Sequence, residues 1–156
     1  MMRVYSNDFN HNEQLNKRHT CDAEDISPHL KWEDIPQGTK SFAISCINND
    51  TKHGTLGHWY VYNIPSDTRE IPRAGPIPGI EIENDFGNIG YEGPNFPSEI
   101  HSYIFTIYAL DVKELNDLTP INFRRKVHKH TIEKADIIGK YEREFDFRDF
   151  QKMSCH

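Results

Sequence analysis

Three segments of the chain are dense in β-branched and aromatic residues, the types that favour strands. They are residues 41–47, 58–64 and 101–110. Residues that favour turns, mainly Gly, Pro, Asn and Asp, lie around each of them. This pattern predicts three strands at the centre of a mainly β fold.

The segment 101–110 has apolar side chains at both alternating sets of positions. A strand with one face in water would alternate apolar and polar residues instead. Apolar residues on both faces indicate a strand that is covered from both sides, as in the middle of a β-sandwich. One set is Tyr103, Phe105 and Ile107, and the other is Ile104, Tyr108 and Leu110.

A helix and a further strand are predicted after these segments. Thr119 can cap a helix and Pro120 suits a first turn. Apolar residues then recur at helical spacing, which predicts a helix over about 120–130. Residues 136–143, with two isoleucines before a glycine, indicate a late strand.

Length and composition fit one domain, which we predict over residues 1–143. Within it, residues 65–97 hold most of the nine prolines and five of the nine glycines. Irregular backbone of this length in a compact protein usually serves binding. Residues 144–156 form a tail with three phenylalanines among charges, which either docks on the domain or frays.

The net charge of −6 and the pI of about 5.8 argue against a nucleic-acid or anionic-membrane partner. The basic cluster at 124–130 is interpreted as the solvated face of the predicted helix. No run of about 20 apolar residues marks a membrane span, and residues 1–10 lack the apolar core of a secretory signal. Cys21, Cys46 and Cys155 are an odd set without a C-x-x-C pair, which predicts reduced thiols. A cytoplasmic protein is therefore expected.

Polar residues suited to chemistry gather at residues 48–50, at His58 and along residues 90–97 up to His101 and Tyr103. Such residues, at strand ends and in loops, can converge while a sheet supports them. Either histidine alone is more often a hydrogen-bonded structural residue. Together they favour a functional site rich in hydrogen-bond donors, namely imidazole N–H, tyrosine O–H and backbone N–H groups.

A series of short runs follows one another in the order and at nearly the spacing of a known family: Ile26-Ser27-Pro28-His29-Leu30-Lys31-Trp32, His58-Trp59-Tyr60-Val61-Tyr62-Asn63-Ile64-Pro65, Asn84-Asp85-Phe86-Gly87, Gly90-Tyr91-Glu92-Gly93-Pro94, His101-Ser102-Tyr103, Tyr108-Ala109-Leu110-Asp111 and Ile138-Gly139-Lys140-Tyr141. These runs resemble the phosphatidylethanolamine-binding protein family, and in particular its bacterial Raf-kinase-inhibitor-like branch. The resemblance covers about residues 1–143. No single motif is diagnostic, but the ordered set is specific.

The resemblance implies a Greek-key β-sandwich with a few peripheral helices and a pocket for phosphate, sulfate, acetate or a phospholipid head group. Family members act as binders or kinase-pathway modulators rather than as established catalysts, so neither an enzyme activity nor a cofactor or metal is expected. The implied partner is a small phosphate-bearing ligand, with a protein partner and a homodimer as further options. Carried over by position, the ligand-binding residues are Asn48, Asp50, His58, Gly93, Pro94, Pro97, His101 and Tyr103.

The chain departs from the family within these motifs. The first motif, usually Asp-Pro-Asp-Ala-Pro, begins with Asn48 and Asn49, and in the third motif Phe96 replaces a proline and Ser102 an arginine. Loss of the leading carboxylate should remove positive charge from a neighbouring imidazole, whereas an Asn48 amide can donate to an anion. If charged histidines hold the anion, its affinity should fall as the pH rises through their titration.

Two other functions stay open. One is a metal-assisted hydrolase with His58, His101 and Asp50 as a two-histidine, one-carboxylate site. The other is an interaction protein whose pocket is degenerate and whose aromatic tail docks a partner. Bound phosphate would favour the binder, a tetrahedral metal would favour the hydrolase, and an occluded pocket would favour the interaction protein.

Overall fold

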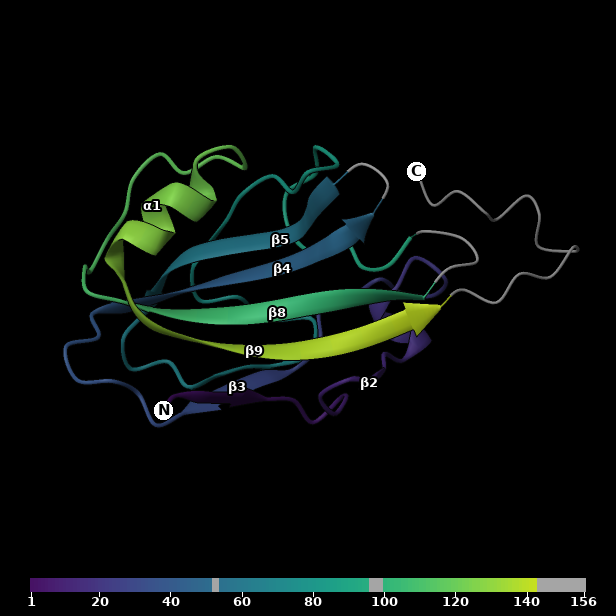
Figure 1. Ribbon diagram of the computed structural model, residues 1–156, viewed down its shortest axis with the longest axis horizontal. Coiled ribbons are helices and arrows are strands. Elements are labelled where there is room, and N and C mark those ends of the chain that lie inside the picture. The colour runs from purple at the N-terminus through teal and green to yellow at the C-terminus, as the bar shows by residue number, and fades with distance from the viewer. Residues whose placement is uncertain (52–53, 96–99, 143–156) are drawn as a thin grey trace, which may run out of the picture.

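A computed structural model describes residues 1–51, 54–95 and 100–142, and its strands form two sheets (Figure 1). The small sheet has the order β1-β3-β6, formed by β1 (Arg3–Tyr5), β3 (Leu30–Glu33) and β6 (Glu70–Ile71). The large sheet has the order β2-β9-β8-β4-β5-β7, formed by β2 (Glu13–Gln14), β9 (Thr131–Glu142), β8 (Ile100–Leu110), β4 (Ser41–Thr51), β5 (Gly54–Pro65) and β7 (Ile80–Glu81). The described helices are the short 3₁₀ helix η1 (Lys17–His19) and α1 (Phe123–His130). The prediction of a mainly β fold is confirmed.

The three predicted central strands are β4, β5 and β8, which lie side by side in the large sheet. β4 pairs antiparallel with β5 on one side and with β8 on the other. β4 and β5 extend beyond the segments predicted for them, because their pairing continues past the β-branched and aromatic runs, and β8 begins one residue early, at Ile100. Asn48, for example, still pairs with Leu56.

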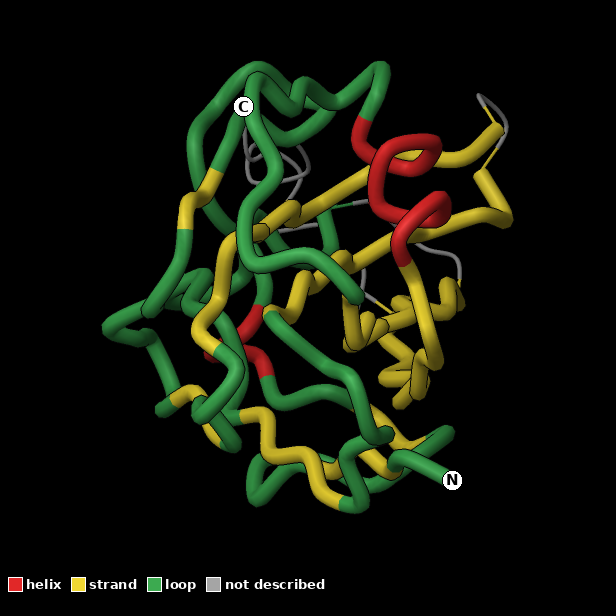
Figure 2. Tube along the Cα trace, turned by 90° about the vertical axis from the view of Figure 1, so that its left-hand side faces the viewer, coloured by secondary structure: helices red, strands yellow, loops and turns green. Residues whose placement is uncertain are grey.

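Both faces of the large sheet are covered, and this makes β8 the two-faced strand that the sequence predicts. Its inner face packs with the small sheet around Trp32, whose ring meets the edge of Phe42 at 5.6 Å between centroids. On the other face lies α1 (Figure 2). Its Phe123 and Val127 side chains are buried in the core on that side of the sheet. Full burial of one such large side chain contributes about 1.5–3 kcal/mol. These two cores hold β4, β5 and β8 rigidly together.

The helix and the last strand differ from their predicted bounds. α1 begins at Phe123, not at 120, because Thr119 and Asn122 close a separate turn first. Its basic side chains lie on the solvent side, as the sequence indicates. β9 begins at Thr131, earlier than the predicted 136, because it pairs with β8 along the whole length of that strand.

The prediction of reduced thiols is wrong for Cys21, which is disulfide-bonded. Cys46 is a free thiol in the core, and its burial raises the pKa of the thiol. The number and spacing of cysteines do not determine which of them form disulfides, because that depends on their distances in the folded chain. Across the residues that the structure describes, there is no helix with the length and apolar character of a membrane span.

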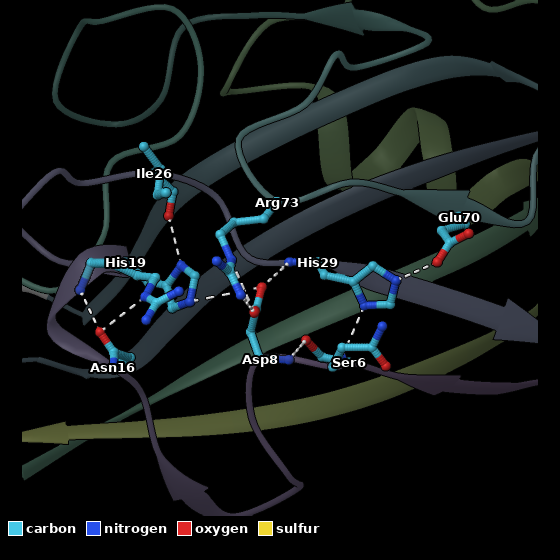
Figure 3. A network of polar contacts seen from close by, with 10 residues as sticks. Ser6, Asp8, Asn16, His19, Ile26, His29, Glu70 and Arg73 are labelled. Atoms are coloured by element: carbon cyan, nitrogen blue, oxygen red, sulfur yellow. Dashed lines mark hydrogen bonds and ion pairs between the residues drawn. The ribbon is translucent and has the colours of Figure 1, made fainter.

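A polar network fixes the N-terminal segment beside the small sheet (Figure 3). The buried Asp8 carboxylate accepts hydrogen bonds from the His29 backbone N–H at 2.7 Å and from the Arg73 guanidinium. Burial would raise the pKa of Asp8, but these hydrogen bonds and the charge of Arg73 hold it below its usual range. The Nδ1 atom of His19, also in this network, donates to the Ile26 carbonyl at 2.9 Å. These contacts hold η1 in place, and η1 in turn supports the site described next.

Candidate functional site

The candidate site lies on the inner face of the large sheet, at the end where β4 finishes and where β5 and β8 begin (Figure 1). Asn48 lies near the end of β4, and His58 lies near the start of β5. His101 and Tyr103 lie near the start of β8. Because these strands are antiparallel neighbours, residues far apart in the sequence meet at one end of the sheet.

A β-bulge directs His58 into this site. Cys46 pairs with Trp59 and the next residue, Ile47, pairs with Gly57, so His58 is an extra residue on β5. Such a bulge re-aims a side chain, and here His58 and Trp59 are consecutive and both fully buried. A Cβ on Gly57 would lie 1.8 Å from the Tyr60 hydroxyl, so any other residue before the histidine would force the Tyr60 ring to move.

The His58 imidazole is held in one tautomer. Its Nδ1 atom lies 2.7 Å from the carbonyl oxygen of Glu92, and because a carbonyl only accepts, Nδ1 carries the hydrogen. Its Nε2 atom is buried and has no hydrogen-bond partner in the described part of the chain. The ring meets Phe86 and Tyr103 edge to face, with centroids at 5.0 and 5.1 Å.

Burial lowers the pKa of His58 to about 4, against opposing contributions from the Glu92 and Gly93 backbone and from nearby carboxylates. The imidazole is therefore neutral at pH 7 in the ligand-free protein. This bears on the sequence-based hypothesis that charged histidines hold the anion, because His58 is not a charged donor in the ligand-free protein. The sequence does not reveal the low pKa of His58, because burial against Phe86 and Tyr103 in the folded protein causes it.

His101 is oriented by Asp50. Its Nδ1 atom lies 2.8 Å from Asp50 Oδ1, and because a carboxylate only accepts, this Nδ1 also carries a hydrogen. The Asn48 amide nitrogen lies 3.2 Å from the same Nδ1 and cannot donate to it while the hydrogen points to Asp50. Asp50 also accepts from the backbone N–H of Ser102 at 3.4 Å, and its side chain is 45% exposed. Asp50 thus lies at the rim of the site and orients the His101 ring.

Tyr103 keeps its hydroxyl hydrogen. Burial raises the pKa of Tyr103, the nearby Asp50 raises it further, and a hydrogen bond with the Asn48 side chain lowers it only in part. Asn48 is fully buried, so its amide contacts Tyr103 in the interior of the protein and not at the surface. The tyrosine hydroxyl can therefore donate to a ligand at any pH near neutrality.

The segment that carries Gly93 and Pro94 closes the site beside His58. The Gly93 backbone N–H donates to Asp25 Oδ1 at 2.7 Å, and the Pro94 carbonyl accepts from Cys21 N–H at 3.1 Å. A Cβ on Gly93 would lie 1.8 Å from the His19 carbonyl oxygen, so this close approach needs glycine. The predicted site residue Pro97 lies outside the described residues.

The structure adds three residues that sequence reasoning missed as parts of the site. They are Glu92, whose carbonyl accepts the His58 hydrogen, Phe86, which meets the imidazole edge to face, and Asp25, which accepts from the Gly93 N–H. The motifs 84–87 and 90–94 flagged two of these positions but not their roles, because a backbone carbonyl leaves no mark in the residue type. Nothing in the sequence distinguishes Asp25 from other surface carboxylates.

The site does not gather the ligands that a metal-assisted hydrolase would need. Among residues 1–51, 54–95 and 100–142, no three His, Cys, Asp or Glu side chains are placed to share a metal ion. Asp50 contacts His101, whereas His58 contacts the Glu92 backbone instead. His58, His101 and Asp50 therefore do not form the two-histidine, one-carboxylate cluster that the alternative function would require.

Comparison with known proteins identifies relatives of this chain. The family model described as phosphatidylethanolamine-binding protein matches residues 5–142. A UPF0098 protein of Aquifex aeolicus is 42% identical over 155 residues, which cover 92% of this chain and 90% of that protein. The UPF0098 protein YbhB of Escherichia coli is 36% identical over 159 residues, which cover 90% of this chain and 99% of that protein.

Two solved structures have the same fold. The putative phosphatidylethanolamine-binding protein homologue CT736 of Chlamydia trachomatis superposes with a TM-score of 0.86 at 29% identity, over 92% of this chain and 98% of that one. YbcL of Escherichia coli, described as a member of the mammalian family, has a TM-score of 0.85 at 28% identity, over 92% and 99% of the two chains. The match of the family model, these relatives and the shared fold show that the chain belongs to the phosphatidylethanolamine-binding protein family.

Proposed function

We propose that this protein is a binding protein for small oxyanions, above all for a phosphate group, and not an enzyme. The observation that carries the proposal is the buried Nε2 atom of His58, which has no hydrogen-bond partner among the described residues. An unpaired buried polar atom usually costs about 1–3 kcal/mol, so it needs a reason. A ligand that pairs with it supplies that reason.

The surroundings of His58 support a polar ligand. Tyr103 keeps a hydrogen that it can donate, and His101 is oriented by Asp50 at the rim. Membership of the phosphatidylethanolamine-binding protein family supports a ligand-binding role in general. A phospholipid head group is one source of a phosphate group and a free phosphate compound is another.

The alternative of an interaction protein with a degenerate pocket has less support. Asn48 departs from the family motif, yet it is fully buried and contributes to the hydrogen bonding of Tyr103. His58, His101 and Tyr103 lie together in spite of the departures around them. This grouping supports a site that still accepts a ligand.

Phosphate is expected to stabilise the protein, and His58 is expected to be needed for this effect. A ligand at 100 times its Kd adds about 2.7 kcal/mol to the stability of a protein that binds it only when folded. We therefore expect a dose-dependent rise of Tm with inorganic phosphate in a thermal-shift assay, and little or no rise in His58→Asn. Asparagine keeps a donor for the Glu92 carbonyl and removes the Nε2 atom.

The matched control is His128→Asn, which changes an exposed histidine on α1 at the opposite end of the sheet (Figure 1). This variant should respond to phosphate like the wild type. Chloride salts at equal ionic strength control for general salt effects. A rise of Tm with zinc but not with phosphate would contradict the proposal and favour the hydrolase.

A further inference from the structure

The β-bulge that directs His58 inward is held by Asp85, a residue of the loop that follows β7. Asp85 Oδ2 accepts from the Gly57 backbone N–H at 2.5 Å, and the Asp85 backbone N–H donates to the Gly57 carbonyl at 2.9 Å. A bulge interrupts the regular pairing of a strand, so the backbone groups beside it need other partners. Asp85 supplies a partner for both backbone groups of the residue that precedes His58.

The same carboxylate also binds Tyr60, on the other side of His58 along β5. The Tyr60 hydroxyl donates to Asp85 Oδ1 at 3.1 Å and lies 3.3 Å from Oδ2. Burial raises the pKa of Tyr60, and the charge of Asp85 and the hydrogen bond to it raise this pKa further, so the hydroxyl keeps the hydrogen that it donates. One carboxylate therefore ties together the two positions of β5 between which His58 lies.

The segment 84–92, to which Asp85 belongs, makes further contacts with His58. The Phe86 ring meets the imidazole edge to face, with centroids 5.0 Å apart. The Glu92 backbone N–H donates to the His58 carbonyl at 3.0 Å, and the Glu92 carbonyl accepts from His58 Nδ1 at 2.7 Å. This segment therefore contacts both the backbone and the ring of His58.

Hydrogen bonds of the buried Asn84 close this segment on itself. The Asn84 amide nitrogen donates to the Gly90 carbonyl at 3.1 Å, and Asn84 Oδ1 accepts from the Phe86 backbone N–H at 2.9 Å. Because the segment is linked in this way, the contacts of Asp85 with β5 determine where the whole segment lies relative to the imidazole.

We propose that Asp85 is a positioning residue of the site. Its carboxylate fixes the bulge at Gly57 and holds the segment 84–92 against His58, so that the imidazole keeps the orientation and the tautomer with which it meets a ligand. Asp85 acts through the backbone of β5 and through this segment. The effect on ligand binding rests on the proposed function, whereas the effect on the imidazole can be measured without a ligand.

Two variants of Asp85 separate its hydrogen bonds from its charge. Asp85→Ala removes both. Asp85→Asn removes the charge but keeps an oxygen for the Gly57 N–H, and its amide can donate to the Tyr60 hydroxyl, which also accepts. The matched control is Asp67→Ala, which changes an exposed aspartate in the turn after β5.

The tautomer of His58 is read from ¹H–¹⁵N correlation spectra of the ligand-free proteins at pH 7, and the affinity for inorganic phosphate is measured by calorimetric titration. In Asp85→Ala we expect the hydrogen to be shared between the two ring nitrogens and the affinity to fall about tenfold or more. Asp85→Asn and Asp67→Ala should keep the hydrogen on Nδ1 and an affinity within about threefold of the wild type. A purely structural role would lower the stability of Asp85→Ala and leave the tautomer of the folded protein unchanged.

Circular dichroism shows whether each variant is folded. If Asp85→Ala is not, Asp85→Ser takes its place, because serine keeps a polar side chain that is one atom too short to reach both partners. A wild-type tautomer and affinity in the Ala or Ser variant would overturn the inference and leave the proposed function standing. An equal loss in Asp85→Asn would also overturn it, because the charge would then be the cause. Failure of the wild type to bind phosphate overturns the proposed function, while the tautomer of the variants still decides the role of Asp85.

Discussion

Gly93→Ala is expected to lower the free energy of unfolding by about 3 kcal/mol, at the upper end of the usual cost of overpacking. The added Cβ would lie 1.8 Å from the His19 carbonyl oxygen, 2.7 Å from the Tyr91 hydroxyl and 2.9 Å from an Asp25 carboxylate oxygen. The first of these is backbone and cannot rotate away, so the segment that carries Glu92 has to move.

Movement of this segment would also release the His58 Nδ1 hydrogen from the Glu92 carbonyl. Gly93→Ala should therefore lose phosphate binding as well as stability. The measurements are urea unfolding at pH 7 and the thermal-shift response to phosphate.

Gly87→Ala is the control for the Gly93 substitution. It lies in the same loop region, has φ +87°, and leaves its Cβ with nothing within 4 Å. It should cost about 1 kcal/mol, from the left-handed backbone alone, and keep phosphate binding. Equal small losses in both variants, with binding intact in both, would contradict the close packing of Gly93 on η1.

Acid is expected to destabilise the protein through His58. The folded pKa is about 4 and the usual histidine value is 6.5, so the unfolded chain binds more protons between these two values. Stability from neutral His58 is fully present above pH 6.5 and is lost as the pH falls toward 4. A difference of this size corresponds to about 3 kcal/mol at pH 4.

The measurement is urea unfolding at pH 7, 5.5 and 4 in the wild type, His58→Asn and His128→Asn. The dependence on pH should be smaller in His58→Asn by about 3 kcal/mol over this range and unchanged in His128→Asn. Part of the dependence should remain in His58→Asn, since burial also lowers the pKa of His19. The same pH dependence in the wild type and His58→Asn would show that this imidazole is not buried in its neutral form.

The central strands could be predicted because their β-branched and aromatic residues favour strands and need to be buried. Strand β8 carries apolar side chains on both faces, and only a position between two packed layers satisfies both. The first residues of β9 and α1 were harder to predict. Pairing with β8 sets where β9 begins, and the Thr119–Asn122 turn sets where α1 begins. Those features depend on partners that are distant in the sequence or on side-chain hydrogen bonds, which periodicity does not report.

Residue types alone drew attention to His58 and His101, but the full set of site residues came from the resemblance to a family, because these histidines lie on different strands. The orientation and the tautomer of these side chains could not be predicted from the resemblance. The bulge that turns His58 inward depends on the register of β4 with β5, and its tautomer depends on a backbone carbonyl. The condition that His58 is charged could not be checked from the sequence either, because burial in the folded protein lowers the pKa of this imidazole.

The most direct test of the account is ¹H–¹⁵N correlation spectroscopy of the histidine side chains, with and without inorganic phosphate at pH 7. In the free protein, His58 should show a hydrogen on Nδ1 and none on Nε2. Saturating phosphate should shift the Nε2 resonance of His58 and leave that of the exposed His128 in place. A His58 that carries its hydrogen on Nε2 in the free protein, or that keeps its resonances at saturating phosphate, would contradict the proposal that this atom contacts the ligand.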